Sequence, residues 1–248
     1  MSSLSTSKWT KYKVLHRSEN IRVHLPETRW LTVDAFWQML AKYSQVIVKP
    51  TGSYGGNGVI RIKQIDASTY AIQDGAKIQT LSKAEDVTAT IKKKAARNYI
   101  VQQCVSLAKM NGRPFDLRVM VQRTPRTKWQ VTGKLAKVAG KGFIVTNIRR
   151  SNGKVVTVGN ALRHSELADK NTADLLALLH TVALRTAKLL GPSYRWVKTM
   201  GIDMAFDNQG RIWIIEVNFA PMLELFLRLP NKSVYHTIKS FHARRKSR

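Results

Sequence analysis

The sequence predicts an α+β protein built from two lobes. Helix-like and strand-like segments are mixed along the 248 residues, and antiparallel hairpins are prominent among the expected strands. The chain is 44% hydrophobic and long enough for one large domain or two small lobes with a real core. It contains no repeat, low-complexity tract or flexible linker. We expect the lobes to meet near residue 100.

The first 44 residues predict two helices. Residues 7–17 favour a short helix with Ser5 or Ser7 as its N-cap, and Pro26 interrupts the pattern that follows. Residues 32–43 begin with a threonine cap and carry apolar side chains along one side, which predicts an amphipathic helix.

The middle of the chain predicts one helix followed by three strands. Ser82 and Glu85 have the spacing of a capping box and are expected to open the helix. Residues 99–105 predict a buried strand. Two longer strands follow at 115–123 and 129–138, joined by a turn that contains a proline.

The last third begins with a looser basic region and then contains the clearest helix. Residues 171–191 carry apolar side chains at helical spacing, and Gly191 and Pro192 end this helix. Residues 201–218 predict a β-hairpin, and a short helical tail follows. These segments divide the chain into a helical N-terminal segment, a first lobe, a second lobe and a basic tail, at residues 1–44, 45–98, 99–230 and 231–248.

The net charge is the unusual feature of the composition. Forty-two Lys and Arg face fifteen Asp and Glu, for a formal charge of +27. A field of that sign attracts polyanions such as nucleic acid, nucleotides or acidic peptides, or an anionic surface. For each of the two densest clusters taken alone, residues 91–97 and 242–248, we favour a solvated surface with a basic tail over a binding role.

Simple features argue against several classes of protein. No apolar run approaches the length of a membrane span, and the first residues lack the apolar core of a signal peptide. Cys104 is the single cysteine, so an internal disulfide is excluded. The six histidines show no ligand spacing, and no Ser-His-Asp or Cys-His arrangement stands out. We expect a cytoplasmic protein.

A lysine and four glycines separate two predicted strands, residues 46–48 and 58–62. Glycines let the backbone turn tightly and present N–H groups to an anion. In a P-loop the lysine follows the glycines, and in a Rossmann fingerprint a helix opens after them, so this motif is neither. We expect a flap that closes over a triphosphate, with a flexible hairpin loop as the alternative. The motif consists of Lys49, Gly52, Ser53, Gly55, Gly56 and Gly58.

The hairpin at residues 201–218 brings two carboxylates to one face. If Phe206 pairs with Arg211, then Asp203 pairs with Ile214. Glu216, two residues after Ile214, is then a diagonal neighbour of Asp203 on the same face. The opposite face is then apolar and belongs to a core. Its expected members are Ile202, Met204, Phe206, Trp213, Ile215 and Val217.

That arrangement predicts a divalent metal site. Asp203 and Glu216 repel each other unless a proton or cation lies between them, and Asn218 lies on the same face. Carboxylate and amide oxygens suit Mg²⁺ or Mn²⁺, which often bridge to substrate phosphates. The alternative is that Asp203 caps a strand end while Glu216 is solvated or salt-bridged.

Basic residues near the two longer strands are candidates for anion binding. Arg118 is expected to hold a phosphate or a developing acyl-phosphate charge, and pairing with Asp116 or Asp203 is the alternative. A further set would line a site for an anionic acceptor, or form a solvated face: Lys134, Lys137, Lys141, Arg149 and Arg150.

In their order along the chain, these motifs resemble those of the ATP-grasp superfamily, and most closely its endospore-coat-associated YheC/YheD-type group. The resemblance rests on "SKW", "LPET", "VIVKPTGSYGGNGV", "YIVQQCV", "FDLRVMVQR", "GIDMAFD" and "WIIEVNFAP". It implies the ATP-grasp fold, in which two α+β lobes with antiparallel sheets sandwich ATP. Members of the superfamily usually carry a domain before the opening lysine. Only seven residues precede Lys8, so we expect most of that domain to be missing here.

The resemblance also implies where the nucleotide binds. Lys8 and Lys49 would contact the nucleotide together with the glycine flap. The backbone of Gln103 and Val105, in the strand that serves as the hinge, would meet the adenine. Gln102 stands where the family commonly has a glutamate.

The remaining implied roles concern the metal and the chemistry. The implied Mg²⁺ ligands are Asp203, Glu216 and Asn218. Gly201 stands where several carboxylate–amine ligases of the superfamily have an arginine. We therefore expect Arg118 and Lys134 to supply the positive charge at the phosphoryl and carboxylate sites.

The resemblance implies an ATP- and Mg²⁺-dependent ligase that joins a carboxylate to an amine or thiol through an acyl phosphate and releases ADP and phosphate. The acceptor would be a small molecule, or an acidic peptide or protein. One alternative is a nucleotide-binding structural or regulatory protein of the spore coat without catalysis. The other is a basic protein that binds nucleic acid or another polyanion, which the ordered motifs disfavour.

Overall fold

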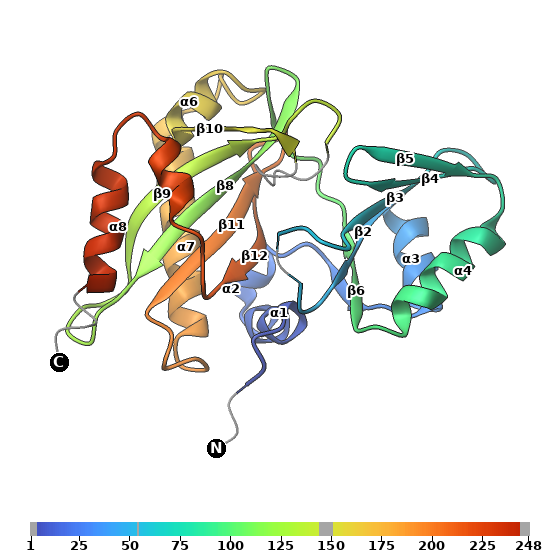
Figure 1. The fold of residues 1–248 in the computed structure, drawn as a ribbon, viewed down its shortest axis with the longest axis horizontal. Helices are drawn as coiled ribbons and strands as arrows, with labels where there is room; N and C mark the ends of the chain where they lie inside the picture. The colour runs from blue at the N-terminus through green and yellow to red at the C-terminus, as the bar shows by residue number, and fades with distance from the viewer. Residues whose placement is uncertain (1–3, 54, 144–150, 244–248) are drawn as a thin grey trace.

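The computed structural model describes residues 4–53, 55–143 and 151–243 and consists of two lobes that lie side by side (Figure 1). Each lobe is built on a six-stranded sheet, and the strands pair antiparallel, so the α+β prediction is confirmed. The helices are α1 (Lys8–His16), α2 (Glu19–Arg22), α3 (Val33–Tyr43), α4 (Ala84–Ala95), α6 (Val158–Arg163), α7 (Thr172–Leu190), the 3-10 helix η1 (Glu224–Arg228) and α8 (Ser233–Ala243). The strands are β1 (Thr28–Trp30), β2 (Gln45–Pro50), β3 (Ile60–Gln64), β4 (Tyr70–Asp74), β5 (Lys77–Leu81), β6 (Tyr99–Gln103), β7 (Lys109–Met110), β8 (Arg113–Gln122), β9 (Gln130–Val138), β10 (Lys154–Val156), β11 (Thr199–Phe206) and β12 (Ile212–Asn218).

The first lobe is a sheet in the order β1-β6-β2-β3-β4-β5, with α3 and α4 on one face (Figure 1). The predicted threonine cap is confirmed, because the Thr32 hydroxyl accepts a hydrogen bond from the backbone of Ala35. Phe36 and Leu40 of α3 and Ile91 of α4 are buried against the sheet. This burial fixes the strand β2 that carries Lys49.

The second lobe is a sheet in the order β10-β9-β8-β11-β12, with β7 paired to β8. Helix α7 lies against one face and α8 against the other, as Figure 1 shows. Alternate residues of β8 divide between these faces: Leu117 and Val119 join the core under α7, whereas Met120 packs with Ile238 of α8. The polar residues between them are therefore held on the face opposite α7.

The boundary between the lobes differs from the expected one. The sheet of the first lobe includes β6, which pairs with β1 and β2, so the chain passes to the second lobe after Gln103 and not at residue 99. The first two helices, in turn, pack onto the second lobe, where Leu15 and Ile21 join its core. The N-terminal segment thus contributes to both lobes and crosses the junction.

One local expectation fails, and one hairpin was missed. Helix α4 begins at Ala84 after Lys83 in an extended conformation, with no side-chain cap, so the capping box at Ser82 is wrong. The β4–β5 hairpin was not expected from the sequence. Residues 77–81 lie mostly exposed at the sheet edge and lack apolar alternation. Within the described residues, no helix is long and apolar enough to cross a membrane.

Candidate nucleotide and metal site

A cleft lies at the junction of the lobes and is lined by helix α1, the first sheet and strand β12. Polar groups come from all three sources, and the aliphatic side chains between them make the floor apolar. The lining residues are Lys8, Lys11, Tyr12, Leu15, Leu25, Thr28, Lys49, Ile100, Gln102, Ile214, Ile215, Glu216 and Val217.

Lys8 connects the glycine loop to the end of β12. Its helix starts there because the Ser7 hydroxyl caps α1 by accepting from the backbone of Thr10. The Lys8 ammonium donates to the carbonyl oxygen of Ser53 and lies 3.5 Å from Oε1 of Glu216. One lysine of the second lobe therefore contacts the loop of the first lobe and a predicted metal ligand.

Lys49 lies in β2 and is only 6% exposed. Its ammonium donates to Oε1 of Gln102 at 2.7 Å, and Gln102 donates in turn to the Thr28 hydroxyl at 2.8 Å. Burial lowers the pKa of Lys49 to about 8, with Glu216 opposing the shift and Lys8 adding to it. The cleft thus holds a buried cation whose nearest hydrogen-bond acceptor is neutral.

Lys11 is a third cleft lysine, which the sequence reasoning missed. It donates to the carbonyl oxygen of Val217 and lies 4.9 Å above the ring of Phe219. Burial lowers its pKa to about 8 as well. Its position three residues after Lys8 on one helix was the available signal, because such residues share a helix face.

The glycine loop depends on conformations that favour glycine. Gly55, Gly56 and Gly58 have φ values of 70°, 76° and 73°. A Cβ at Gly58 would also lie 2.8 Å from the hydroxyl of Tyr99. Gly58 therefore lies against the side chain of Tyr99, the first residue of β6.

Strands β11 and β12 bring the two carboxylates together in a register that differs from the prediction. Phe206 pairs with Ile212, and a β-bulge after Asp203 sets that residue directly opposite Glu216. The expected pairs Phe206–Arg211 and Asp203–Ile214 are therefore wrong. The expected apolar face is corrected too: the core contains Ile212 and Ile214 in place of Trp213 and Ile215. A bulge adds one residue to one strand, and alternation alone does not reveal it.

Asp203 is the centre of a buried charge network. Arg118 holds it with two hydrogen bonds of 2.8 and 2.9 Å, and Lys137 lies 3.0 Å from its Oδ1. Asn218 donates to its Oδ2 at 3.1 Å. Burial alone would raise the pKa of the Asp203 carboxyl, but Arg118 and Lys137 outweigh this and hold it well below its usual range. The alternative reading of Arg118, as a partner of Asp203, is confirmed.

Lys137, and not the expected Lys134, lies on the same face of the sheet as Asp203. Lys134 pairs with Val119, whose side chain belongs to the core under α7, so it projects from the face opposite Arg118. Lys137 projects to the site face, where it also forms an ion pair of 3.0 Å with Asp116. The two carboxylates outweigh the effect of burial and raise the pKa of Lys137. Arg149 and Arg150 lie outside the described residues.

The geometry also explains the glycine at position 201. A Cβ there would lie 2.5 Å from Pro221 and 3.2 Å from the stem of Arg118. An arginine at this position would collide with both. Arg118 reaches the same face from the neighbouring strand β8.

The hinge residues lie where the two lobes join. Gln103 ends β6, and its backbone N–H donates to the carbonyl of Glu27 at 2.8 Å. Val105 follows outside the strand and is partly buried. Their contact with adenine stays a prediction. Among the described residues there is no cluster of three or more His, Cys, Asp or Glu that could hold a metal ion. The assignment of Asp203, Glu216 and Asn218 as metal ligands stays a prediction.

Comparisons with known proteins agree on one family. The profile of the YheC/D-like ATP-grasp family matches residues 1–242. The chain is 24% identical over 246 residues to the endospore coat-associated protein YheD of Bacillus subtilis (strain 168), and over 229 residues to YheC of the same organism. These matches cover 96% and 90% of this chain, but only 52% and 61% of the two relatives. The chain thus spans about half the length of YheD.

Solved structures support the same fold. The ATP-grasp ligase PsnB, complexed with a phosphomimetic variant of its minimal precursor, Mg and ADP, superposes with a TM-score of 0.57 at 17% identity, over 96% of this chain and 58% of PsnB. The ADP complex of PurK, an N5-carboxyaminoimidazole ribonucleotide synthetase, gives 0.51 at 16% identity, over 88% of this chain and 45% of PurK. The ATP-grasp fold expected from the motifs is therefore confirmed.

Proposed function

This chain belongs to the YheC/D-like ATP-grasp family, and from that premise we propose that it is an ATP- and Mg²⁺-dependent ligase. It would join a carboxylate to an amine or thiol through an acyl phosphate. The observation that carries the proposal is Lys8, which joins the Ser53 carbonyl of the glycine loop to the Glu216 carboxylate across the lobe junction. The proposed lid, phosphate-binding cation and metal carboxylate would thus meet at the lobe junction.

The charges in the cleft suit a nucleoside triphosphate. Lys8, Lys11 and Lys49 face a single lining carboxylate, Glu216. Burial leaves Lys11 and Lys49 short of compensating charge, so phosphate oxygens would stabilise their protonated forms. The glycine loop would cover the phosphates, and the backbone at the end of β6 would meet the base.

The donor chemistry suits Mg²⁺ held partly by those phosphates. Asp203 and Glu216 are directly opposed, and Asn218, whose amide nitrogen donates to Asp203, would offer its amide oxygen. Mg²⁺ typically takes one or two carboxylates from the protein and the remaining oxygens from phosphate and water. Bound there, it would neutralise charge on the transferred phosphoryl group. Two cations, Arg118 and Lys137, already neutralise Asp203 and keep it ionised.

The chain's own residues would then position two displacement steps. A carboxylate oxygen of the acceptor attacks the γ-phosphorus, the bond to the β–γ bridging oxygen breaks, and ADP leaves. The amine nitrogen next attacks the acyl carbon, the C–O bond to phosphate breaks, and the amine proton passes to solvent or base. Arg118 and Lys137 would stabilise the oxygens that gain negative charge in both steps.

A trapping experiment tests this proposal. The protein is incubated with MgATP, hydroxylamine as the amine, and a panel of carboxylates that includes Glu-rich peptides. We expect hydroxamate and ADP to form in equal amounts with at least one carboxylate. Both should be lost in Glu216→Gln and retained in Glu19→Gln, a control on exposed helix α2. MgATP binding without hydroxamate would instead favour the nucleotide-binding protein without catalysis.

A further inference from the structure

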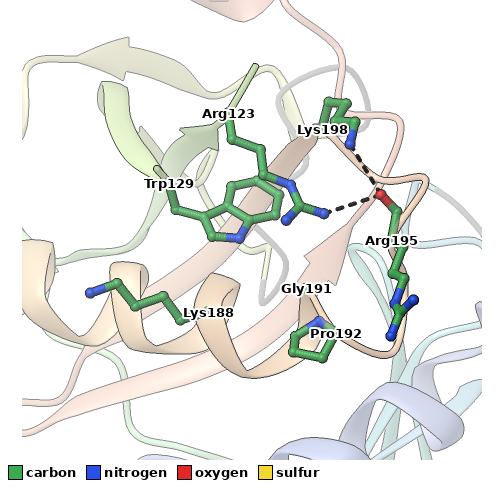
Figure 2. A pocket seen from close by; sticks show the side chains of 7 residues that line it. All are labelled: Arg123, Trp129, Lys188, Gly191, Pro192, Arg195 and Lys198. Atoms are coloured by element: carbon green, nitrogen blue, oxygen red, sulfur yellow. Dashed lines mark hydrogen bonds between the residues drawn. The ribbon is translucent and has the colours of Figure 1, made fainter. Parts of the chain in front are cut away.

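An open basin of about 520 Å³ lies at the end of the second sheet (Figure 2). It is formed where β8 ends, β9 begins and α7 gives way to the loop before β11. None of its residues lines the cleft. The lining residues are Arg123, Trp129, Lys188, Gly191, Pro192, Arg195 and Lys198.

The basin is cationic without local compensation. Four of its lining side chains are basic and none is acidic. The two stretches that build it contain no Asp or Glu at all, from residue 117 to 165 and from 175 to 202. Among the ion pairs of the described residues, none involves these four cations. The local charge is therefore available to a ligand.

Arg123 is fixed at the centre of the basin. Its guanidinium lies 4.5 Å above the ring of Trp129, as Figure 2 shows, and donates to the carbonyls of Val197 and Arg195 at 3.1 Å each through Nη2. Within the described residues, its Nη1 group makes no hydrogen bond. Gly191 permits this packing, because a Cβ there would lie 2.9 Å from the Trp129 ring nitrogen. The guanidinium is thus held in place while its Nη1 amino group remains available to a ligand.

Three further cations border this fixed centre. Lys188 and Arg195 are exposed, and Figure 2 shows them extending along opposite sides of the basin. Lys198 donates to the Arg195 carbonyl at 3.2 Å. Since its Nε and Nη2 groups donate to backbone carbonyls, Arg123 offers its Nη1 group to one carboxylate oxygen. The exposed side chains of Lys188 and Arg195 can bind further carboxylates beside it.

We propose that the basin binds an acidic peptide segment, a run of Glu or Asp side chains presented by a partner protein. Charge complementarity favours this occupant. A nucleic acid is disfavoured because Trp129 is only 9% exposed and Arg123 covers its ring, so a base has no free face on which to stack. Trp196, at 56% exposure, lies in the same loop but contacts Phe219 and does not line the basin.

The basin and the nucleotide cleft are separate sites. Arg123 lies five residues beyond Arg118, which is about 17 Å along an extended chain. Arg118 faces Asp203 on one side of the sheet, whereas Arg123 lies against Trp129, a member of the core under α7. The proposal therefore does not depend on the nucleotide chemistry, and a bound peptide would leave the cleft accessible.

Fluorescence anisotropy with a labelled hexaglutamate peptide tests the proposal. The test variant is Lys188→Gln with Arg195→Gln, both exposed, so that folding is preserved. The matched control is Lys92→Gln with Lys93→Gln, an exposed pair on α4 that removes the same charge. We expect about tenfold weaker peptide binding in the test variant and less than a twofold change in the control.

Three results would overturn the assignment. Equal losses in both variants would mean that only the overall positive field attracts the peptide. Absence of measurable hexaglutamate binding at low salt would exclude the site. Tighter binding of a labelled hexathymidylate, weakened by the same test pair, would assign the basin to single-stranded nucleic acid instead.

Discussion

Replacing Lys49 by methionine should stabilise the fold near neutral pH. The change removes a buried ammonium whose pKa is lowered from 10.5 to about 8. At about 1.4 kcal/mol per pH unit, this corresponds to a penalty of about 3 kcal/mol in the wild type at pH 7. Loss of the hydrogen bond to Gln102 offsets about 1–2 kcal/mol of the gain. We expect a net increase of about 1 kcal/mol in the free energy of unfolding.

The pH dependence identifies the cause. Between pH 8 and 10.5 the unfolded chain binds more protons at this lysine than the folded protein, so wild-type stability rises with pH in that window. The penalty is fully present below pH 8 and is largely gone by pH 10. The free energy of unfolding of Lys49→Met, relative to that of the wild type, should therefore decrease by about 2.5 kcal/mol from pH 7 to pH 10.

Urea unfolding at both pH values provides the assay. Lys63→Met is the matched control, because Lys63 is an exposed lysine on the neighbouring strand β3. A Lys49→Met difference that is independent of pH would refute the reasoning. It would mean that the lysine is solvated or that another anion compensates it.

Three further outcomes follow from the site. ATP affinity should fall as pH rises above about 8, since bound phosphates favour the protonated forms of Lys11 and Lys49. Calorimetry should show that the affinity of Lys11→Arg for ATP depends less steeply on pH than that of the wild type. An unchanged pH dependence would place Lys11 outside the site. Asp203→Asn should destabilise the protein by about 3–5 kcal/mol in urea unfolding, because it leaves two buried cations undercompensated; a loss below about 1 kcal/mol would contradict the network. Gly58→Ala should lower the free energy of unfolding by about 1–2 kcal/mol for its positive φ alone. Gly52→Ala, with nothing within 4 Å of the new Cβ, should leave it nearly unchanged. Equal effects of the two substitutions would refute the backbone argument.

Local signals in the sequence predicted the elements that local chemistry determines. The Ser7 and Thr32 caps, and the long helix that begins after Asn171, are confirmed because side chain, backbone and apolar period agree at each position. Strand β5 was missed because its exposed residues lack a burial pattern. The lobe junction lies one strand later than expected, because β6 belongs to the first sheet through its pairing partners and not through its local composition.

The site was predictable in its chemistry and less so in its register. Asp203 and Glu216 were expected on one face and lie there, yet only the bulge makes them direct partners. The same dependence on register moved the predicted second cation from Lys134 to Lys137. Single-residue shifts reverse which face a strand residue occupies, and nothing in the alternation of this segment specifies them.

The most direct test of the central claim is calorimetric titration of ATP, with and without Mg²⁺, into the wild type, Lys49→Met, Glu216→Gln and the control Glu19→Gln. The account predicts binding that Mg²⁺ strengthens in the wild type and in Glu19→Gln. It predicts little binding in Lys49→Met, and binding without Mg²⁺ enhancement in Glu216→Gln. Binding of equal strength in all four proteins, or none in any, would contradict the assignment of this cleft to MgATP.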